Sequence, residues 1–306
     1  MTRYVPIVLL PCLLGVQTIT AAERQPGVSE ADAWRWTLQA GGVYQWESSL
    51  DSGGDMSVSR LFVSGGGAKR VAGRWRLGAN LGYGEDHYDF SGASGFGGLD
   101  PWSRVREVRV GVPVQYFAND QWVVYAIPSA RFNAESGASL DDGFNAGLLA
   151  GASYRVNDTL TIGPGLGAFS EIEDSASFFP ILLIDWKLTD TLSLETGRGF
   201  AASRGPGLQL RWRYSPNWQF AFGGRYEKTR FRLDDDGVAP GGVGQDKAFP
   251  LFLLAEYAMG TDLKLGLVGG VEVGGEMRLE DDKGRLVSRS DLSEAPFLGA
   301  TFEARF

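Results

Sequence analysis

Apolar and polar residues alternate with a period of two along most of the chain, from about residue 34 to the C-terminus. Between Trp75 and Tyr83, for example, every odd-numbered residue is apolar, and the residues between them are arginine, glycine or asparagine. The segments 34–40, 208–214 and 263–267 repeat this pattern. A period of two is typical of β-strands, and no segment of comparable length has the 3.6-residue period of a helix. We therefore expect an all-β chain.

The alternation predicts fourteen strands, at residues 34–47, 56–68, 74–87, 104–117, 121–133, 143–156, 159–171, 176–188, 191–200, 206–214, 218–232, 248–259, 262–279 and 295–306. The connections between them alternate in length. One class is tight and carries turn residues, such as Asn157-Asp158. The other class is long and rich in glycine and acidic residues, as at 90–103 and 233–247. Short turns on one rim and long loops on the other are typical of an up-and-down antiparallel barrel that spans the outer membrane.

The barrel is expected to close on itself. In lipid an unpaired backbone N–H or C=O group costs several kcal/mol, so the first strand must pair with the last. An even number of strands places both termini on the periplasmic side, and the count of fourteen meets this condition. Twelve strands remain an alternative, because the hairpin 191–214 is short and because Phe62 and Val63 leave the orientation of the second strand ambiguous.

Aromatic residues recur near both ends of the predicted strands, always eight or ten residues apart. An even spacing places both members of a pair on one face of the strand. At about 3.3 Å per residue and a tilt near 40°, the spacing covers roughly 20–25 Å along the barrel axis, which is close to the height of an outer-membrane apolar band. We expect two aromatic girdles that face lipid, and a soluble β-sheet is the alternative. The pairs are Trp36 with Tyr44, Trp75 with Tyr83, Trp122 with Phe132, Phe144 with Tyr154, Phe178 with Trp186, Trp218 with Tyr226, and Phe249 with Tyr257.

The N-terminus has the composition of a secretory signal. Arg3 precedes an apolar stretch at 5–16, and Thr20-Ala21-Ala22 provides a small-residue cleavage site. We therefore expect a signal peptide at 1–22, a short periplasmic segment at 23–33 and the barrel at 34–306, with no plug domain. A lipoprotein signal at Cys12 is the alternative.

Composition narrows the possible functions. The 306 residues include 43 glycines but one histidine and one cysteine, and the formal net charge is −8. No apolar window is long enough for a transmembrane helix. The acidic balance argues against a nucleic-acid partner. A single histidine and a single cysteine are too few for a zinc site of His/Cys type or a thiol redox pair, so we expect no cofactor and no metal.

The last ten residues, 297–306, form an alternating segment that ends in an aromatic residue, with Phe302 and Phe306 on one face. This segment resembles the C-terminal signal of Gram-negative outer-membrane barrels, whose terminal phenylalanine is recognised by the barrel-assembly machinery. The resemblance implies an outer-membrane location, surrounding lipid and lipopolysaccharide, and the assembly machinery as a partner during insertion. The chain also resembles the poorly characterised outer-membrane barrel families known as domains of unknown function. We expect a monomer.

Charged residues occupy strand positions between the lipid-facing ones, and parity therefore places them inside the barrel. A charge at the lipid midplane would cost about 2–4 kcal/mol, which supports this placement. These residues line a water-filled channel in one interpretation and simply pair across strands in the other. The predicted lumen-lining residues are Arg74, Arg76, Arg109, Arg131, Arg155, Arg211, Arg213, Arg225, Glu171, Asp185, Glu195, Glu256, Glu272, Glu276 and Glu303.

Several apolar residues also have inward parity. They could form an apolar patch for a hydrophobic ligand, or they could mark strands whose register is misread. Such a patch resembles that of fatty-acid transport barrels, although those barrels have an N-terminal hatch that is not expected here. The residues are Tyr125, Ile127, Phe179, Ile181, Leu183, Phe252 and Leu254.

Catalysis is not expected. Outer-membrane hydrolases need a histidine beside a serine nucleophile or beside aspartates, and His87 is the only histidine. The enzymatic alternative is a catalytic dyad of His87 with Asp86 or Asp89. The simpler interpretation is that His87 is exposed at the rim and has no catalytic role.

The sequence therefore predicts an outer-membrane barrel that acts as a pore for passive passage of small polar solutes. The alternative is a non-conducting structural or surface-binding barrel with a salt-bridged interior, and a transporter of hydrophobic compounds is a third interpretation. The loops at 233–247 and 280–294 could narrow the mouth.

Overall fold

The computed structural model describes residues 33–197, 200 and 204–306. The predicted signal peptide and all but the last residue of the segment 23–33 lie outside these residues. The strands are β1 (Arg35–Ser49), β2 (Asp55–Val71), β3 (Trp75–Ser91), β4 (Arg104–Gly111), β5 (Val114–Phe117), β6 (Trp122–Glu135), β7 (Phe144–Arg155), β8 (Leu160–Glu171), β9 (Asp174–Lys187), β10 (Leu192–Thr196), β11 (Gly207–Arg213), β12 (Trp218–Arg225), β13 (Glu227–Arg232), β14 (Val243–Met259), β15 (Leu263–Glu280), β16 (Leu286–Leu292) and β17 (Ala295–Arg305). The helical elements are α1 (Gly95–Leu99) and the 3₁₀ turn η1 (Leu140–Gly143).

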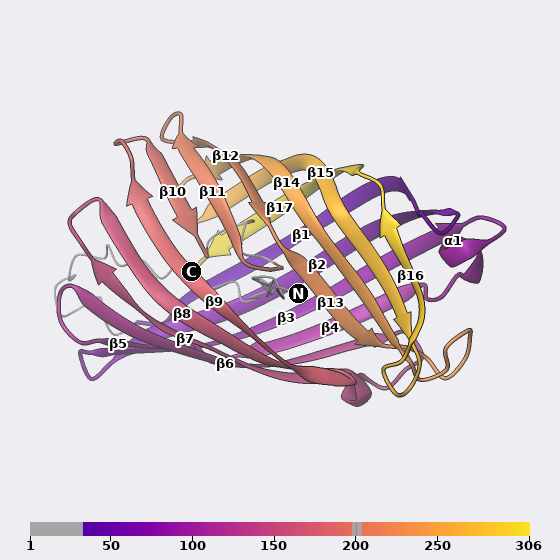
Figure 1. Ribbon diagram of the computed structural model, residues 1–306. Coiled ribbons are helices and arrows are strands. Elements are labelled where there is room, and N and C mark those ends of the chain that lie inside the picture. Colours follow the sequence, from indigo (N-terminus) through magenta and orange to yellow (C-terminus); the bar gives the residue numbers. More distant parts are fainter. Residues whose placement is uncertain (1–32, 198–199, 201–203) are drawn as a thin grey trace, which may run out of the picture.

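These strands form one closed antiparallel barrel of fourteen strands (Figure 1). Three barrel strands are interrupted and so appear as two segments each: β4 with β5, β12 with β13, and β16 with β17. Both members of each pair bond to the same neighbouring strand. The barrel closes where β1 pairs with β17, from Thr37 opposite Arg305 to Gln45 opposite Phe297. The predicted fold class, strand number and closure are confirmed, and twelve strands are excluded.

The outer face of the barrel is apolar. Leu81, Leu253 and Leu267 are each about 60 % exposed, whereas inward neighbours such as Phe252 and Val268 are buried. Aromatic residues of the predicted girdles contact one another across strands, as Trp122 does with Tyr154 and Trp218 with Tyr257. The chain is thus an outer-membrane β-barrel of the Gram-negative kind, as the sequence predicts.

One predicted girdle residue does not face lipid. Tyr226 is buried, because the strand is interrupted between Arg225 and Glu227 and the ring packs against Phe169 and Phe179. Its backbone N–H donates to the carbonyl of Pro206. The pairing of Trp218 with Tyr226 across the apolar band is therefore wrong.

The orientation of the second strand is also settled. Leu61 and Val63 are exposed on the lipid side, while Phe62 lines pockets in the interior. Parity then places Arg60 inside as well, where it is buried.

The end of the barrel with the long loops is closed by an apolar core. A bridge between Ala134 of β6 and Arg232 of β13 joins these two strands beyond the last β6–β7 pair, Phe132 with Phe144. Figure 1 shows α1 and β16 at this end. The loops predicted to narrow the mouth contribute Leu233, Ala239 and Leu292 to the core. Its full membership is Leu50, Met56, Val58, Tyr88, Phe90, Phe96, Trp102, Val105, Phe231, Leu233, Ala239, Met277, Leu279 and Leu292.

The ladder of β9 is incomplete. This strand pairs with β8 along its length but with β10 only from Asp185 to Lys187. The hydroxyl of Thr196, at the end of β10, accepts a hydrogen bond from the N–H of Ile184 at 2.7 Å and donates to the carbonyl of Leu182 at 3.2 Å. Among the described residues, no strand pairs with the rest of this edge.

Pro180 lies further along the same edge. Backbone groups of alternate residues point to the same side of a strand, so the nitrogen of Pro180 faces the side to which Leu182 and Ile184 present their polar groups. Proline has no N–H, so it leaves no unpaired donor there, and edge strands are where proline is tolerated in sheets. Near this edge Tyr226 forms a buried cluster with Phe169 and Phe179.

Charged contacts join β13 to the turn between β8 and β9 at the outer end of this edge. Lys228 lies 2.7 Å from Glu171, Arg230 donates to the carbonyl of Ile172 at 2.9 Å, and Arg232 lies 2.7 Å from Glu173.

Within the described part of the chain, no helix is long and apolar enough to cross a bilayer.

Candidate functional site

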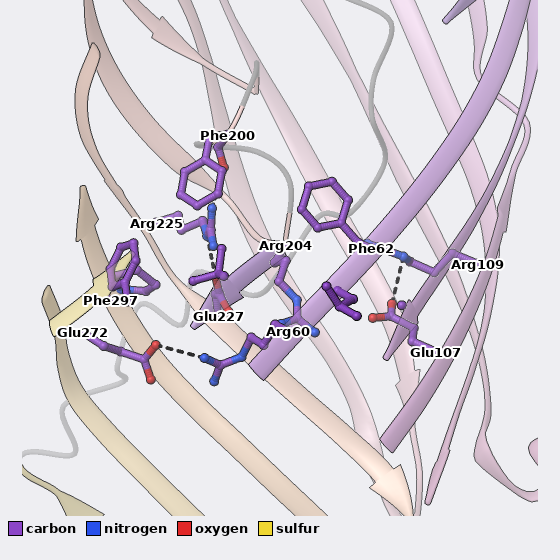
Figure 2. A pocket seen from close by; sticks show the side chains of 14 residues that line it. Arg60, Phe62, Glu107, Arg109, Phe200, Arg204, Arg225, Glu227, Glu272 and Phe297 are labelled. Carbon is purple, nitrogen blue, oxygen red and sulfur yellow. Dashed lines mark hydrogen bonds and ion pairs between the residues drawn. The ribbon is translucent and has the colours of Figure 1, made fainter. Parts of the chain in front are cut away.

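A small pocket, with a cavity volume of about 20 Å³, lies in the middle of the barrel (Figure 2). It is lined from both sides of the interior, because β1–β4 contribute to one part and β12–β17 to another. Two further lining residues, Phe200 and Arg204, come from the connection between β10 and β11. The lining residues are Val43, Arg60, Leu61, Phe62, Gly84, Glu107, Arg109, Phe200, Arg204, Arg225, Glu227, Pro250, Glu272 and Phe297.

Arg60 connects strands that are not neighbours in the sheet. Its guanidinium donates to Gln45 at 2.8 Å and to Asp246 of β14 at 2.9 Å, and it lies 3.6 Å from Glu272 of β15. The hydroxyl of Tyr88 donates to the same Asp246 oxygen at 2.8 Å. These contacts cross the interior, so side chains and not open water fill this level of the barrel.

A second set of ion pairs continues around the pocket. Arg204 contacts Asp86 at 2.5 Å, and Arg225 forms a hydrogen-bonded ion pair with Glu227. Arg225 also donates to the carbonyl of Phe200 at 2.7 Å, and its guanidinium lies 4.0 Å from the centre of the Phe200 ring. Figure 2 shows Arg225, Phe200 and Glu227 grouped on one side of the pocket.

A second small pocket, with a cavity volume of about 50 Å³, adjoins the first. Both pockets are lined by Phe62 and Phe200, so these two rings lie between them. The second pocket is lined otherwise by Gln39, Glu256, Lys264 and Glu303, together with small and apolar residues. Charged groups and phenyl rings thus alternate along the interior.

The wall formed by β6–β9 is different, because it carries clusters of apolar inward residues beside polar ones such as Arg131 and Asn133. Tyr125, Ile127 and Leu149 form one cluster, and Phe169 and Phe179 belong to another. The predicted inward parity of the apolar residues on this wall therefore marks a real apolar surface and not a misread register.

Glycines in this wall provide the space for the rings. A Cβ added at Gly167 would overlap with the ring of Phe179, and one added at Gly147 would overlap with Phe169. In both cases the glycine lies directly opposite the ring on the neighbouring strand. Part of the high glycine content is thus explained by ring packing against the backbone.

The predicted lumen-lining residues divide into three groups. Fully buried ones are Arg109, Arg131, Arg225, Glu195, Glu272 and Glu276. Partly buried ones are Arg76, Arg155, Arg211, Glu171, Asp185, Glu256 and Glu303. Of all these, the first pocket brings together Arg109, Arg225 and Glu272.

The third group, Arg74 and Arg213, does not line the interior. Arg74 is exposed in the turn before β3 and donates to the carbonyl of Ala118, and Arg213 is exposed at the end of β11 and donates to the carbonyl of Asp190. Parity assigns a face but not a depth, so it cannot separate a rim residue from one inside the barrel. Of the predicted assembly signal, Phe302 is half-buried and Phe306 is exposed beyond the end of β17.

Five charged residues of the ion pairs described above were absent from the predicted site: Arg60, Asp86, Arg204, Glu227 and Asp246. Parity could have found Arg60 once Leu61 was assigned to the lipid face. Arg204 lies in a connection, where no periodicity indicates its direction, and only the folded chain brings it to Asp86.

His87 lies at the outer rim. Its side chain is 41 % exposed and contacts Glu85, whereas Asp86 points away from it and binds Arg204. The dyad of His87 with Asp86 is therefore not formed. The described residues contain no group of three histidine, cysteine, aspartate or glutamate side chains arranged to hold a metal ion.

No protein-family model and no curated protein matches the sequence. Among solved structures, the barrel is similar to an outer-membrane channel from Pseudomonas putida F1, with a TM-score of 0.48 and 11 % identity over 93 % of this chain and 100 % of that chain. The toluene transporter TodX of Pseudomonas putida aligns with a TM-score of 0.45 and 10 % identity over 90 % of each chain. The translocator domain of the autotransporter NalP from Neisseria meningitidis gives 0.39 and 14 % over 87 % of each chain. These similarities concern the barrel and assign no ligand to this chain.

Proposed function

We propose that this outer-membrane barrel is a channel for small amphipathic organic solutes and not a water-filled pore. The observation that carries the proposal is a filled interior in which phenyl rings, among them Phe62 and Phe200, lie beside charged groups around two small pockets. Each pocket offers phenyl rings beside charged groups, and sites for small molecules typically combine an apolar lining with a few polar groups. A freely hydrated sugar or ion would find little open water in this interior.

The closed outer end supports a route through the side of the barrel. The apolar core at that end blocks the axial path, whereas the ladder beside β9 is interrupted, and the cluster of Phe169, Phe179 and Tyr226 lies near the interruption. Moving aromatic side chains aside breaks no backbone hydrogen bond. An apolar solute that reaches the lipid-facing wall can therefore pass between β9 and β13 into the interior.

Uptake by cells with an intact lipopolysaccharide layer tests this proposal. Expression of the barrel should raise uptake of a radiolabelled small aromatic compound several-fold without raising uptake of a pentose sugar. Phe179→Ala should increase the aromatic flux further, while Phe178→Ala, at the neighbouring lipid-facing position, should leave it unchanged. Equal gains for the sugar and the aromatic compound would overturn the proposal and restore the polar-solute pore.

A second candidate is a non-conducting barrel held together by its interior ion pairs. The observation in its favour is the number of buried charges that pair across the interior, such as Arg60 with Asp246 and Arg230 with Glu280. This candidate predicts that expression changes the uptake of neither compound.

A further inference from the structure

The lipid-facing surface of β14 changes from apolar to cationic toward the end with the long loops. Leu253, Leu251 and Phe249 are exposed on this face, and the next residue with the same parity is Lys247. Two residues of strand cover roughly 7 Å, so Lys247 lies just beyond the apolar band. Long loops face the cell exterior in barrels of this kind, which puts Lys247 at the headgroup level of the outer leaflet.

A bulge brings charged residues of β15 to the same face. Between the partners of Phe249 and Lys247, β15 carries one residue more than β14. Beyond the bulge, Met277 points into the apolar core, so its neighbours Glu276 and Arg278 point outward. Alternation alone cannot show this change of parity, and the prediction that Glu276 lines the lumen is therefore wrong.

Two arginines lie directly opposite each other on this outer face, Arg278 of β15 and Arg289 of β16. The next pair, Met277 with Ser290, is buried, which confirms that both arginines point outward. Like charges directly opposite on adjacent strands are destabilising, because their Cβ atoms are about 5 Å apart. Lys247 is the diagonal neighbour of Arg278 on the other side, so three cations occupy adjoining positions of three strands.

The carboxylates nearby leave much of the hydrogen-bonding capacity of these cations unused. Arg278 lies 3.1 Å from Glu280, but that carboxylate also accepts a hydrogen bond from β13. Lys247 and Arg289 share one oxygen of Glu276, at 3.5 and 2.7 Å. Neither Arg278 nor Lys247 donates a hydrogen bond to any described residue.

The remaining carboxylate of this surface is Asp291, which lies 3.3 Å from Arg289 and is exposed. Exposed ion pairs of this kind contribute little to stability, so Arg289 can exchange this contact for a stronger one. A phosphate is such a partner, since it presents several acceptor oxygens and binds two N–H groups of a guanidinium at once.

We propose that Lys247, Arg278 and Arg289 bind a phosphate group of lipopolysaccharide on the outer face of the barrel. The phosphate removes the repulsion between the two opposed arginines and occupies their unused donors. The exposed residues from Phe249 to Leu253 continue this surface into the apolar band, where they contact the acyl chains of the same lipid. The site is independent of what the interior carries.

Native mass spectrometry of the purified barrel tests this proposal, with bisphosphorylated lipid A as the probe. The barrel should bind this lipid at least tenfold more tightly than the same lipid without its phosphates. The double substitution Arg278→Gln with Arg289→Gln should weaken binding at least tenfold and abolish the preference. The matched control Arg285→Gln removes one cation from the same hairpin, where it is bonded to Asp281 at the loop tip, and should change the affinity less than twofold.

Three results would overturn the proposal. Equal binding of the phosphorylated and dephosphorylated lipids would show that the acyl chains alone are recognised. An equal loss in the Arg285→Gln variant would show that only net charge matters. Displacement of lipid A by millimolar inorganic phosphate would identify a site for the free anion, whereas retention of the lipid supports the lipid site. Heat-modifiable migration in gels confirms that each variant is folded.

Discussion

The two walls of the barrel both face lipid, but they carry different inward side chains. The wall formed by β1–β4 and β12–β17 contains the longest strands, β2, β3, β14 and β15, and charged inward residues, with Arg60 at the centre of a network. The wall formed by β6–β9 has aromatic inward residues set against glycines and ends at an incomplete edge. Both present apolar side chains to lipid. The comparison teaches that the lipid constrains only the outer face, so the inner face is free to differ between the two walls.

The largest expected effect is on the charged wall. Arg60→Met should lower the free energy of unfolding by about 5 kcal/mol, the upper end of the range for breaking a buried ion pair, because two carboxylates lose their partner. Denaturant titration in lipid vesicles, followed by tryptophan fluorescence, measures this. The control Arg285→Met removes an exposed cation and should leave the unfolding free energy unchanged within the error of measurement. If Arg60→Met lowers the free energy of unfolding by less than about 1 kcal/mol, the ion-pair network contributes little to the stability of this wall.

The aromatic wall should respond less strongly. Phe179→Ala is expected to cost about 3 kcal/mol, at the lower end for a buried phenylalanine, because the ring of Tyr226 can move into part of the space. Phe178→Ala, on the lipid-facing side of the same strand, should cost less than about half of that. If the two substitutions cost the same, Phe179 is not enclosed as described.

The incomplete edge of β9 gives a smaller effect. Thr196→Val removes the hydroxyl that bonds Ile184 and Leu182, and leaving these backbone groups unpaired should cost about 1–3 kcal/mol. Hydrogen exchange at the Ile184 amide should accelerate in the same variant. Thr191→Val, at the exposed turn, serves as the control. Unchanged exchange at Ile184 would mean that another group completes this edge.

The smallest effect is expected at the rim. His87→Gln removes an exposed contact with Glu85 and should change both stability and solute uptake by amounts close to the error of measurement. A hydrolytic activity lost in this variant would contradict the expectation that the chain is not an enzyme.

The sequence predicts the barrel well because lipid imposes a local rule. Every second residue of each strand must be apolar, so alternation alone gives the strand number and the lipid-facing set. It also places Glu272 and Arg225 inside. The mouth is different: the loops that carry Phe96, Trp102 and Leu233 meet in a core through contacts that no periodicity encodes.

Two further features depend on tertiary structure in the same way. The predicted strand 191–200 ends at Thr196, and Phe200 instead packs inside the barrel against Phe252. The predicted strand 218–232 is interrupted at Tyr226, whose ring leaves the lipid face for the cluster beside β9. In both places an aromatic ring is buried in a cluster and the strand is interrupted there. A single sequence does not reveal that burial of the ring is preferred to an uninterrupted strand.

The short strands β10 and β11 have a consequence for the surrounding bilayer. A barrel strand needs about 9–11 residues to cross the hydrocarbon layer, and these two have five and seven. Among the described residues, the sheet on this side is therefore shorter than the hydrocarbon layer. We expect the bilayer beside β10 and β11 to become locally thinner, so bilayer thickness should affect the stability of this side of the barrel.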